Sequence, residues 1–331
     1  MTVASRRRLG ARAHDDESLD SDIADLITLV GTTVEAPSDP TPDDRRRLAE
    51  EIAPLFRGPI DGEDFAPVEA VDRTISSRDG ARIGVRIYRP RENARPGTIL
   101  YIHGGGWVAG SVESYEPEVR RLVTLTGMSV ASVEYRRAPE HRRPTPVEDC
   151  LAAARMLIES GEETALSIAG DSAGASLALE CAILLKDSGV ELAGLLLLYP
   201  VIDPTAEDNE SHRVNGRDYL LTSEDMAYYW ESYLGPEKTA SFVAESPFAL
   251  LKLRGLPPIV VVTAGFDPLR DDGRNFARDL VAADVPVVYL PNPTLTHGFQ
   301  QMVPRVHAAT AAVDKAYTVF RDLINGGSPD S

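Results

Sequence analysis

Cysteine and long apolar runs are both scarce in this chain. Cys150 and Cys181 are its only cysteines, and both lie in apolar patterns with helical spacing, so we interpret them as small buried side chains rather than a disulfide or metal site. No apolar run approaches the roughly 18 residues of a membrane-spanning helix. The opening residues MTVASRRRLGARAHDDESLDSD lack the apolar core of a secretory signal. We therefore expect a cytoplasmic protein without a membrane span.

Positive charge is scarce as well. The chain has 51 acidic residues against 34 basic ones, nearly all of them arginine, and its formal net charge is −17. This balance makes nucleic acid and anionic membrane surfaces poor candidates for partners.

The length of 331 residues, 43% of them hydrophobic, suits one large α/β domain with a smaller lobe. We expect a disordered tail at 1–18 and a tail at 326–331. Between them we expect amphipathic cap helices at 19–58, a core at 59–202 and 246–325, and a cap insertion at 203–245.

Eight strand-like runs rich in Val, Ile and Tyr follow residue 65. They are VEAVDRTIS, ARIGVRIYRP, GTILYIH, MSVASVEYR, ALSIAG, LAGLLLLYP, PPIVVVTAG and VPVVYLP. Helical patterns such as PVEDCLAAARMLIES and ASLALECAILLKDSG alternate with the later runs. This alternation predicts a mostly parallel sheet covered by helices on both faces.

The strongest functional signal is GDSAG at residues 170–174. It matches G-x-S-x-G between a strand-like and a helical run, the context in which the motif forms a nucleophile elbow. Ser172 is therefore the candidate nucleophile. Such a serine needs a histidine base and an acid that orients it, in the chain order Ser, Asp or Glu, His.

Only His297 and His307 follow both the elbow and the later strands. His307 lies in a helical pattern, whereas His297 follows the last strand in THGF, so His297 is the candidate base. Asp267 ends a strand, where α/β sheets present functional groups. Asp271 and Asp272 compete for the acid's role, but they lie at the start of a helix, where its dipole alone favours acids. We therefore select Asp267.

The run HGGGW at residues 103–107 follows the third strand. Glycines let backbone N–H groups approach the oxyanion that forms during ester attack. We predict an oxyanion hole at Gly104, Gly105, Gly106 and Ala173, with Gly104 shaping the turn and the other three donating. His103 is expected to hold this loop by hydrogen bonding. The glycine spacing fits neither common phosphate-binding motif.

The sequence resembles the hormone-sensitive-lipase-like carboxylesterases, the bacterial family IV esterases. The matching stretches are HGGGW, YRRAPEH, GDSAG, YPVID, SPFA, LPP, GFDPLRDDG and HGF, in the family's order. The resemblance implies an α/β-hydrolase fold with an eight-stranded sheet and a helical cap, a Ser172–His297–Asp267 triad, and often a homodimer. It matches Glu140 to a family position that supports the serine-turn region, although an exposed turn acid fits equally well. Arg137, Arg142 and Arg143 depart from the family pattern.

The predicted reaction is hydrolysis of short- to medium-chain esters through an acyl-enzyme, with no metal or cofactor. A gibberellin-receptor-like ligand-binding protein is one alternative, but its relatives lose the histidine that His297 supplies here. A lyase and an amidase or carbamate hydrolase are others. Five aromatic residues of the insertion are expected in the cap: Tyr219, Tyr228, Tyr229, Trp230 and Tyr233.

Overall fold

A computed structural model describes residues 18–59, 67–160, 165–236, 242 and 246–326 of the chain. All but the last residue of the tail predicted at 1–18, and all but the first of the tail predicted at 326–331, lie outside the described residues.

The core is one eight-stranded sheet in the order β1-β2-β4-β3-β5-β6-β7-β8. β1 pairs antiparallel with β2, β2 pairs antiparallel with β4, and the remaining neighbours are parallel. The strands are β1 (Val68–Ser76), β2 (Arg82–Pro90), β3 (Thr98–Ile102), β4 (Ser129–Glu134), β5 (Leu166–Asp171), β6 (Gly194–Leu198), β7 (Ile259–Phe266) and β8 (Val287–Thr296). Each overlaps one of the eight predicted runs.

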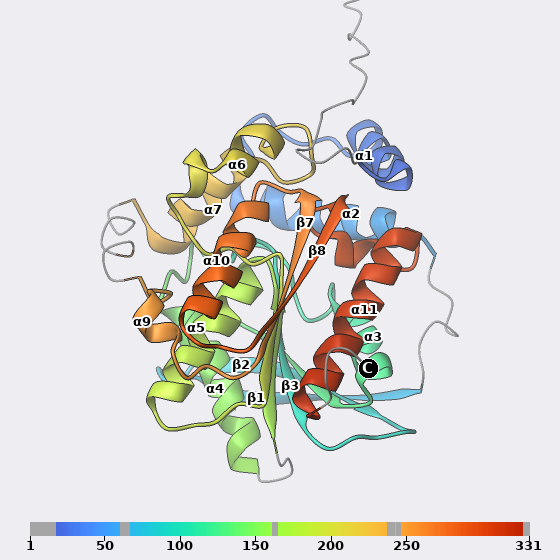
Figure 1. Cartoon of the computed structure of the whole chain (residues 1–331). Coiled ribbons are helices and arrows are strands. Elements are labelled where there is room, and N and C mark those ends of the chain that lie inside the picture. The colour runs from blue at the N-terminus through green and yellow to red at the C-terminus, as the bar shows by residue number, and fades with distance from the viewer. Residues whose placement is uncertain (1–17, 60–66, 161–164, 237–241, 243–245, 327–331) are drawn as a thin grey trace, which may run out of the picture.

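Helices cover both faces of this sheet (Figure 1). On one face lie α4 (Thr145–Ser160), α5 (Ala173–Asp187) and α10 (Arg270–Ala282); on the other lie α3 (Glu116–Thr126) and α11 (His307–Ile324). Two apolar clusters fill the layers, one against each face. Central strands such as β3, β6 and β7 are buried along their whole length, which explains their continuous apolar sequences.

Four helices lie over the carboxyl ends of the parallel strands, at the top of Figure 1. They are α1 (Ser21–Thr33) and α2 (Pro42–Arg57) from the amino-terminal segment, and α6 (Glu210–Asn215) and α7 (Ser223–Leu234) from the insertion. The short α9 (Leu250–Leu253) leads back to β7. α2 and α7 each begin with a capping box, formed by Thr41 with Asp44 and by Thr222 with Asp225, which fixes where each helix starts.

The last strand is longer than predicted. We expected it to end at Pro291, but β8 continues through Pro293 to Thr296 and pairs irregularly with β7 near Ala264. Because β8 is an edge strand, prolines without an N–H group can be accommodated there. Because β8 extends to Thr296, His297 is the first residue after the strand.

The two cysteines are buried and form no disulfide, as the sequence predicted.

Candidate active site

Ser172 occupies the turn between β5 and α5, with φ 52° and ψ −122°. This positive φ is unusual for a residue with a side chain, so contacts with the neighbouring residues must hold the backbone in this conformation. A Cβ on Gly174 would overlap the carbonyl oxygen of Ile102 in β3. The glycine thus lets α5 start against the sheet and hold Ser172 at the edge where the parallel strands end.

His297 lies between Ser172 and Asp267. Its Nε2 is 2.9 Å from the Ser172 Oγ and its Nδ1 is 2.8 Å from the Asp267 Oδ2. Asp267 follows β7 and is fully buried, and its Oδ1 accepts a hydrogen bond of 2.8 Å from the Leu269 N–H. A carboxylate at Nδ1 favours the tautomer that carries its proton there, which leaves Nε2 free to accept the serine proton.

The two competing acids are bonded elsewhere. Asp271 accepts a hydrogen bond of 3.0 Å from the Ser211 N–H in α6, and it pairs with Arg270 and Arg274. Asp272 lies under the chain that follows β6, where the Asn209 side chain donates to it at 3.2 Å. Burial raises the pKa of Asp272 to about 7. Both carboxylates therefore hold the insertion in place.

The other candidate base is also accounted for. His307 is exposed at the first residue of α11, in the helix that the sequence predicted.

The glycine loop after β3 approaches the serine turn. Gly105 and Gly106 have φ values of 106° and 61°, a region that glycine adopts without steric cost. Within the described part of the chain, no acceptor is found for the N–H groups of Gly105, Gly106 and Ala173. The Gly104 N–H donates to Asp171 at 2.8 Å. Gly104 therefore shapes the turn, and three of the four predicted residues keep unoccupied donors.

Asp171 organises a polar cluster that the sequence analysis did not anticipate. Besides the Gly104 N–H, its carboxylate accepts from the Tyr101 hydroxyl at 2.9 Å and the Tyr115 hydroxyl at 3.2 Å. Burial raises the pKa of Asp171 to about 6, although these hydrogen bonds act in the opposite direction. The cluster ties the glycine loop to the residue that precedes Ser172.

His103 holds the loop from behind. Its ring stacks on Tyr135 with 4.3 Å between the centroids, and its Nδ1 lies 2.8 Å from the Gly104 carbonyl oxygen. Complete burial lowers the pKa of His103 to about 3, so the ring is neutral at pH 7 and Nδ1 can donate. This is the hydrogen-bonding position that the sequence predicted.

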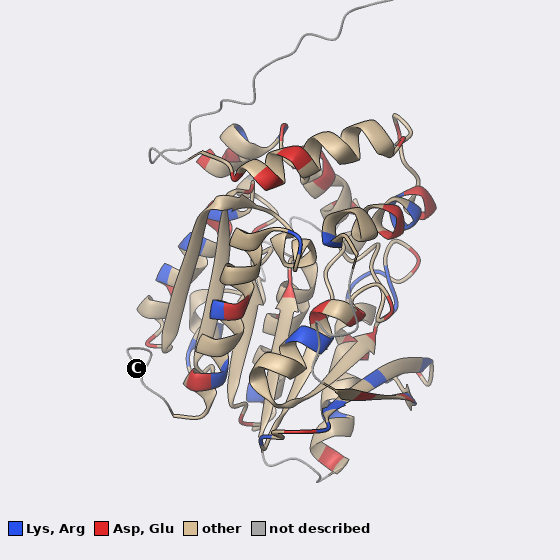
Figure 2. Cartoon of the chain, turned by 90° about the vertical axis from the view of Figure 1, so that its right-hand side faces the viewer, with Lys and Arg blue, Asp and Glu red and all other residues tan. Residues whose placement is uncertain are grey.

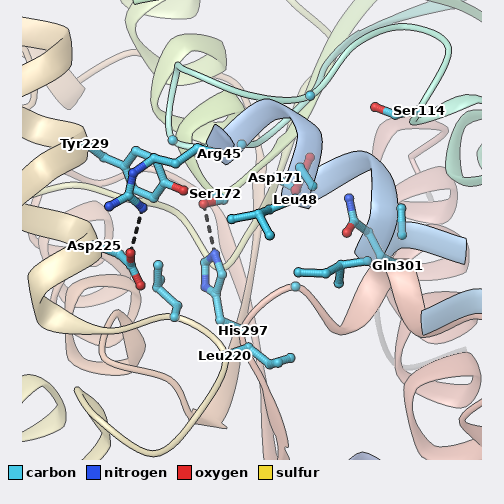
Figure 3. A pocket seen from close by; sticks show the side chains of 18 of the residues that line it. Arg45, Leu48, Ser114, Asp171, Ser172, Leu220, Asp225, Tyr229, His297 and Gln301 are labelled. Atoms are coloured by element: carbon cyan, nitrogen blue, oxygen red, sulfur yellow. Dashed lines mark hydrogen bonds and ion pairs between the residues drawn. The ribbon is translucent and has the colours of Figure 1, made fainter. Parts of the chain in front are cut away.

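A cavity of about 400 Å³ opens over Ser172 and His297. Leu48, Ile52 and Phe56 of α2 and Met226 of α7 contribute apolar walls. Figure 3 shows Leu48 and Gln301 on one side of Ser172 in that view, and Arg45, Asp225 and Tyr229 on the other. The cavity therefore has an apolar part and a polar part.

The aromatic residues of the insertion divide into two groups. Trp230 and Tyr233 pack on Trp107 of the HGGGW stretch, with centroid distances of 4.7 and 4.4 Å. Tyr229 lines the cavity and lies so close to Gly106 that a Cβ there would overlap its ring. Tyr219 packs against Phe266. Most of the group thus provides packing, and Tyr229 belongs to the site.

Glu140 pairs with α2 rather than with the serine turn, which the resemblance suggested it supports. Its half-exposed carboxylate pairs with Arg46 of α2 at 2.6 Å. Arg46 also donates to the Val108 carbonyl oxygen at 2.9 Å. Glu140 therefore anchors α2 to the core, and the exposed-acid interpretation was nearer to the observed position.

A family model described as the alpha/beta hydrolase fold matches residues 99–301, a range that includes Ser172, Asp267 and His297. The chain belongs to this family. Within it, the predicted resemblance to hormone-sensitive-lipase-like carboxylesterases and the predicted fold are confirmed.

Three relatives illustrate the similarity. Esterase LipI of Mycobacterium tuberculosis is 33% identical, with 84% of this chain and 88% of that protein covered. An ethyl acetate hydrolase of Pseudomonas putida is 34% identical over 78% of this chain and 83% of its own. The crystal structure of a thermostable esterase from Pseudomonas putida superimposes with a TM-score of 0.84 at 28% identity, covering 93% of this chain and 98% of that one.

The described residues contain neither a candidate membrane span nor a candidate metal cluster. None of the helices there is long and apolar enough to cross a membrane. No group of three or more His, Cys, Asp or Glu side chains in that part of the hydrolase is arranged to hold a metal ion. Figure 2 shows basic and acidic residues interspersed along the described ribbon rather than gathered into one basic stripe in that view.

Proposed function

We propose that this α/β-hydrolase is a serine carboxylesterase in which Ser172 is the nucleophile, His297 the base and Asp267 the orienting acid. The observation that supports this most strongly is the continuous chain of two hydrogen bonds, 2.9 and 2.8 Å long, that links the three side chains beneath the cavity. The chain is a carboxylic ester hydrolase, as its relatives are; the assignment of roles to residues is our proposal.

In the acylation step, the Ser172 Oγ attacks the ester carbonyl carbon while His297 Nε2 takes the hydroxyl proton. Asp267 stabilises the resulting imidazolium through Nδ1, and burial of this carboxylate away from water strengthens the interaction. The protonated His297 then donates its proton to the departing alkoxide. The products are a Ser172 acyl ester and a free alcohol.

The carbonyl oxygen becomes negatively charged during the attack. We assign its stabilisation to the N–H groups of Gly105, Gly106 and Ala173, whose donors are unoccupied in the described part of the chain. Removing one such donor in other enzymes lowers kcat by about 10² to 10³. Water activated by His297 attacks the acyl-enzyme in the second half of the cycle and restores Ser172.

The cavity supports a preference for short to medium acyl chains. Its apolar walls include residues of α2 and α7, two helices that lie over the carboxyl ends of the parallel strands (Figure 1). Each buried methylene contributes about 0.8 kcal/mol, so activity should rise with chain length until the wall is reached. We expect the optimum at about four to eight carbons, because a covered pocket cannot extend as an open lipid groove can.

The deciding experiment is turnover of p-nitrophenyl butyrate by the purified protein, with and without a sulfonyl fluoride. A carboxylesterase releases p-nitrophenol continuously and the inhibitor abolishes this activity. A receptor-like protein of the same fold would bind a ligand without turnover. The p-nitroanilide of butyric acid tests the amidase alternative, which predicts efficient cleavage of this amide.

We also propose a cytoplasmic location and a homodimer. The first is the location expected from the sequence, and the second rests on the family resemblance. Light scattering on the purified enzyme measures the oligomeric state directly.

A further inference from the structure

An arginine lines the cavity from above. Arg45 of α2 contributes to the wall of the pocket that holds Ser172 and His297, and 12% of its side chain is exposed. Figure 3 shows its guanidinium beside Tyr229, on the side of Ser172 away from Leu48 in that view. A cation at this position is unexpected in a site that only has to receive alkyl chains.

The guanidinium is held in a fixed position by α7. Its Nη1 donates to the Asp225 Oδ1 at 2.8 Å, and its Cζ lies 3.9 Å from the centroid of the Tyr228 ring. Asp225 is itself fixed, because its Oδ2 accepts from the Thr222 hydroxyl at 2.7 Å in the capping box. Arg45 is thus oriented before any substrate arrives, which reduces the entropy lost on binding.

Arg45 has more donors than these contacts use. A guanidinium carries five N–H groups, and among the described residues the side chains of Asp225 and Tyr229 are its hydrogen-bond partners. The Nε atom is buried there without a hydrogen-bond partner. Buried donors are normally hydrogen-bonded, and an unpaired one calls for an explanation. Nε itself is covered, but Arg45 lines the cavity, so an acceptor that enters the cavity can meet the rest of the guanidinium.

The surrounding charges favour a neutral acceptor over an anion. Asp225 already balances the charge of Arg45. A substrate carboxylate placed at Arg45 would therefore lie beside an acid as well as a base. An ether, hydroxyl or carbonyl oxygen could accept from the guanidinium without this repulsion.

We propose that Arg45 is a substrate-binding residue that donates to a neutral oxygen on the acyl or alcohol part of the ester. The preferred substrates are then esters with a second oxygen function, an alkoxy, hydroxy or oxo group, rather than plain alkyl esters of equal length. This inference rests on the proposed esterase function and deepens it.

The test compares isosteric substrates in which one methylene is replaced by oxygen. The acyl pair is p-nitrophenyl pentanoate and p-nitrophenyl 3-methoxypropanoate, and the alcohol pair is butyl acetate and 2-methoxyethyl acetate. For each pair, the ratio of kcat/KM values, ether over alkyl, is measured for the wild type and for Arg45→Met. The two esters of a pair differ in intrinsic reactivity, but this difference is the same for both enzymes. It therefore cancels when the ratio of the variant is compared with that of the wild type.

We expect Arg45→Met to lower the ether-to-alkyl ratio by about tenfold in one of the two pairs, equivalent to about 1.4 kcal/mol. Arg45→Lys should keep part of the ratio, because it retains a donor but not the planar fork. The matched control is Arg47→Met, on the same helix, whose side chain is 47% exposed and pairs with Glu51. This control should leave both ratios unchanged.

Loss of the contact between α2 and α7 would lower the activity on both members of a pair and leave their ratio intact. Ratios that stay within twofold in both pairs would overturn the inference while leaving the esterase function standing. A wild-type preference for 4-carboxybutyl acetate over 2-methoxyethyl acetate would also overturn it, since that acceptor is anionic. Absence of turnover on all these esters would instead contradict the proposed function.

Discussion

The N–H group of Gly104 donates a hydrogen bond of 2.8 Å to the carboxylate of Asp171. This bond joins the glycine loop after β3 to the residue directly before Ser172, so the nucleophile and the proposed oxyanion donors share one support. The hydroxyls of Tyr101 and Tyr115 complete the cluster from the buried side. Placement of the donors relative to Ser172 therefore depends on a residue that need not touch the substrate.

The first prediction concerns Asp171 as a positioning residue. Asp171→Ala leaves the Gly104 N–H and the Tyr115 hydroxyl without an acceptor and frees the loop, so kcat should fall by about 10²-fold, comparable to losing one oxyanion donor. Asp171→Asn keeps an acceptor oxygen and should cost much less. Steady-state kinetics on p-nitrophenyl butyrate separates kcat from KM. Equal losses in the two variants, or an effect confined to KM, would argue against this role.

The second prediction concerns the choice of acid. Asp267→Asn presents an amide to His297 and favours the wrong tautomer, so kcat should fall by about 10⁴-fold. Asp271→Asn and Asp272→Asn remove contacts to the insertion and should retain most of the activity of the folded enzyme. Circular dichroism establishes the folded fraction of each variant before the assay. A loss at either control as large as that of Asp267→Asn would show that the acid is misassigned.

The third prediction concerns pH and stability. Burial raises the pKa of Asp272 from its usual 3.8 to about 7, so the folded state holds this proton more tightly than the unfolded chain does. The stability that this provides is complete below pH 4 and is lost as the pH rises from about 4 to about 7. Asp272→Asn removes this titration, and its unfolding free energy should decline less over that window.

Urea unfolding of both proteins at pH 4.5, 5.5, 6.5 and 7.5 checks this difference. The other buried acids are present in both proteins, so their contributions to the pH dependence cancel in the difference between the two unfolding free energies. Curves of unfolding free energy that run parallel for the wild type and the variant would refute the shift at Asp272.

The fourth prediction concerns the amino-terminal helices. Deletion of residues 1–58 removes α1 and α2, including the cavity walls at Leu48, Ile52 and Phe56. The truncated enzyme should be destabilised or should shift its acyl-length optimum, because those walls limit the chain. Deletion of residues 1–18 is the matched control and should change neither. A p-nitrophenyl ester series from acetate to laurate, measured beside thermal unfolding, distinguishes these outcomes, and an unaltered profile after the larger deletion would contradict the cap's role.

Sequence alone located the elements that carry their signal locally. Ser172 is marked by five consecutive residues, and the strands are marked by runs of Val, Ile and Leu that their complete burial requires. Asp267 and His297 could be chosen because each follows a strand, and the parallel strands end at one edge of the sheet. The end of β8 was misjudged because prolines at an edge strand look like a terminus.

Contacts between distant segments carried no comparable signal. Arg45 and Asp225 are 180 positions apart, and Arg46 and Glu140 are 94 apart. Each pair consists of ordinary surface-type residues whose partners are set by how α2 lies over the core. The Asp171 cluster was missed for the same reason, since neither Tyr101 nor Tyr115 carries a local sequence signal for a chemical role.

The central claim is that Ser172 is the nucleophile, and covalent labelling with a fluorophosphonate tests it most directly. Intact-mass spectrometry of the wild type should show one adduct per chain, formed at the same rate at which ester turnover is lost, and peptide mapping should place it on Ser172. Ser172→Ala should remain unlabelled while keeping the wild-type unfolding profile. An adduct that persists in Ser172→Ala, or full labelling with undiminished turnover, would contradict the account.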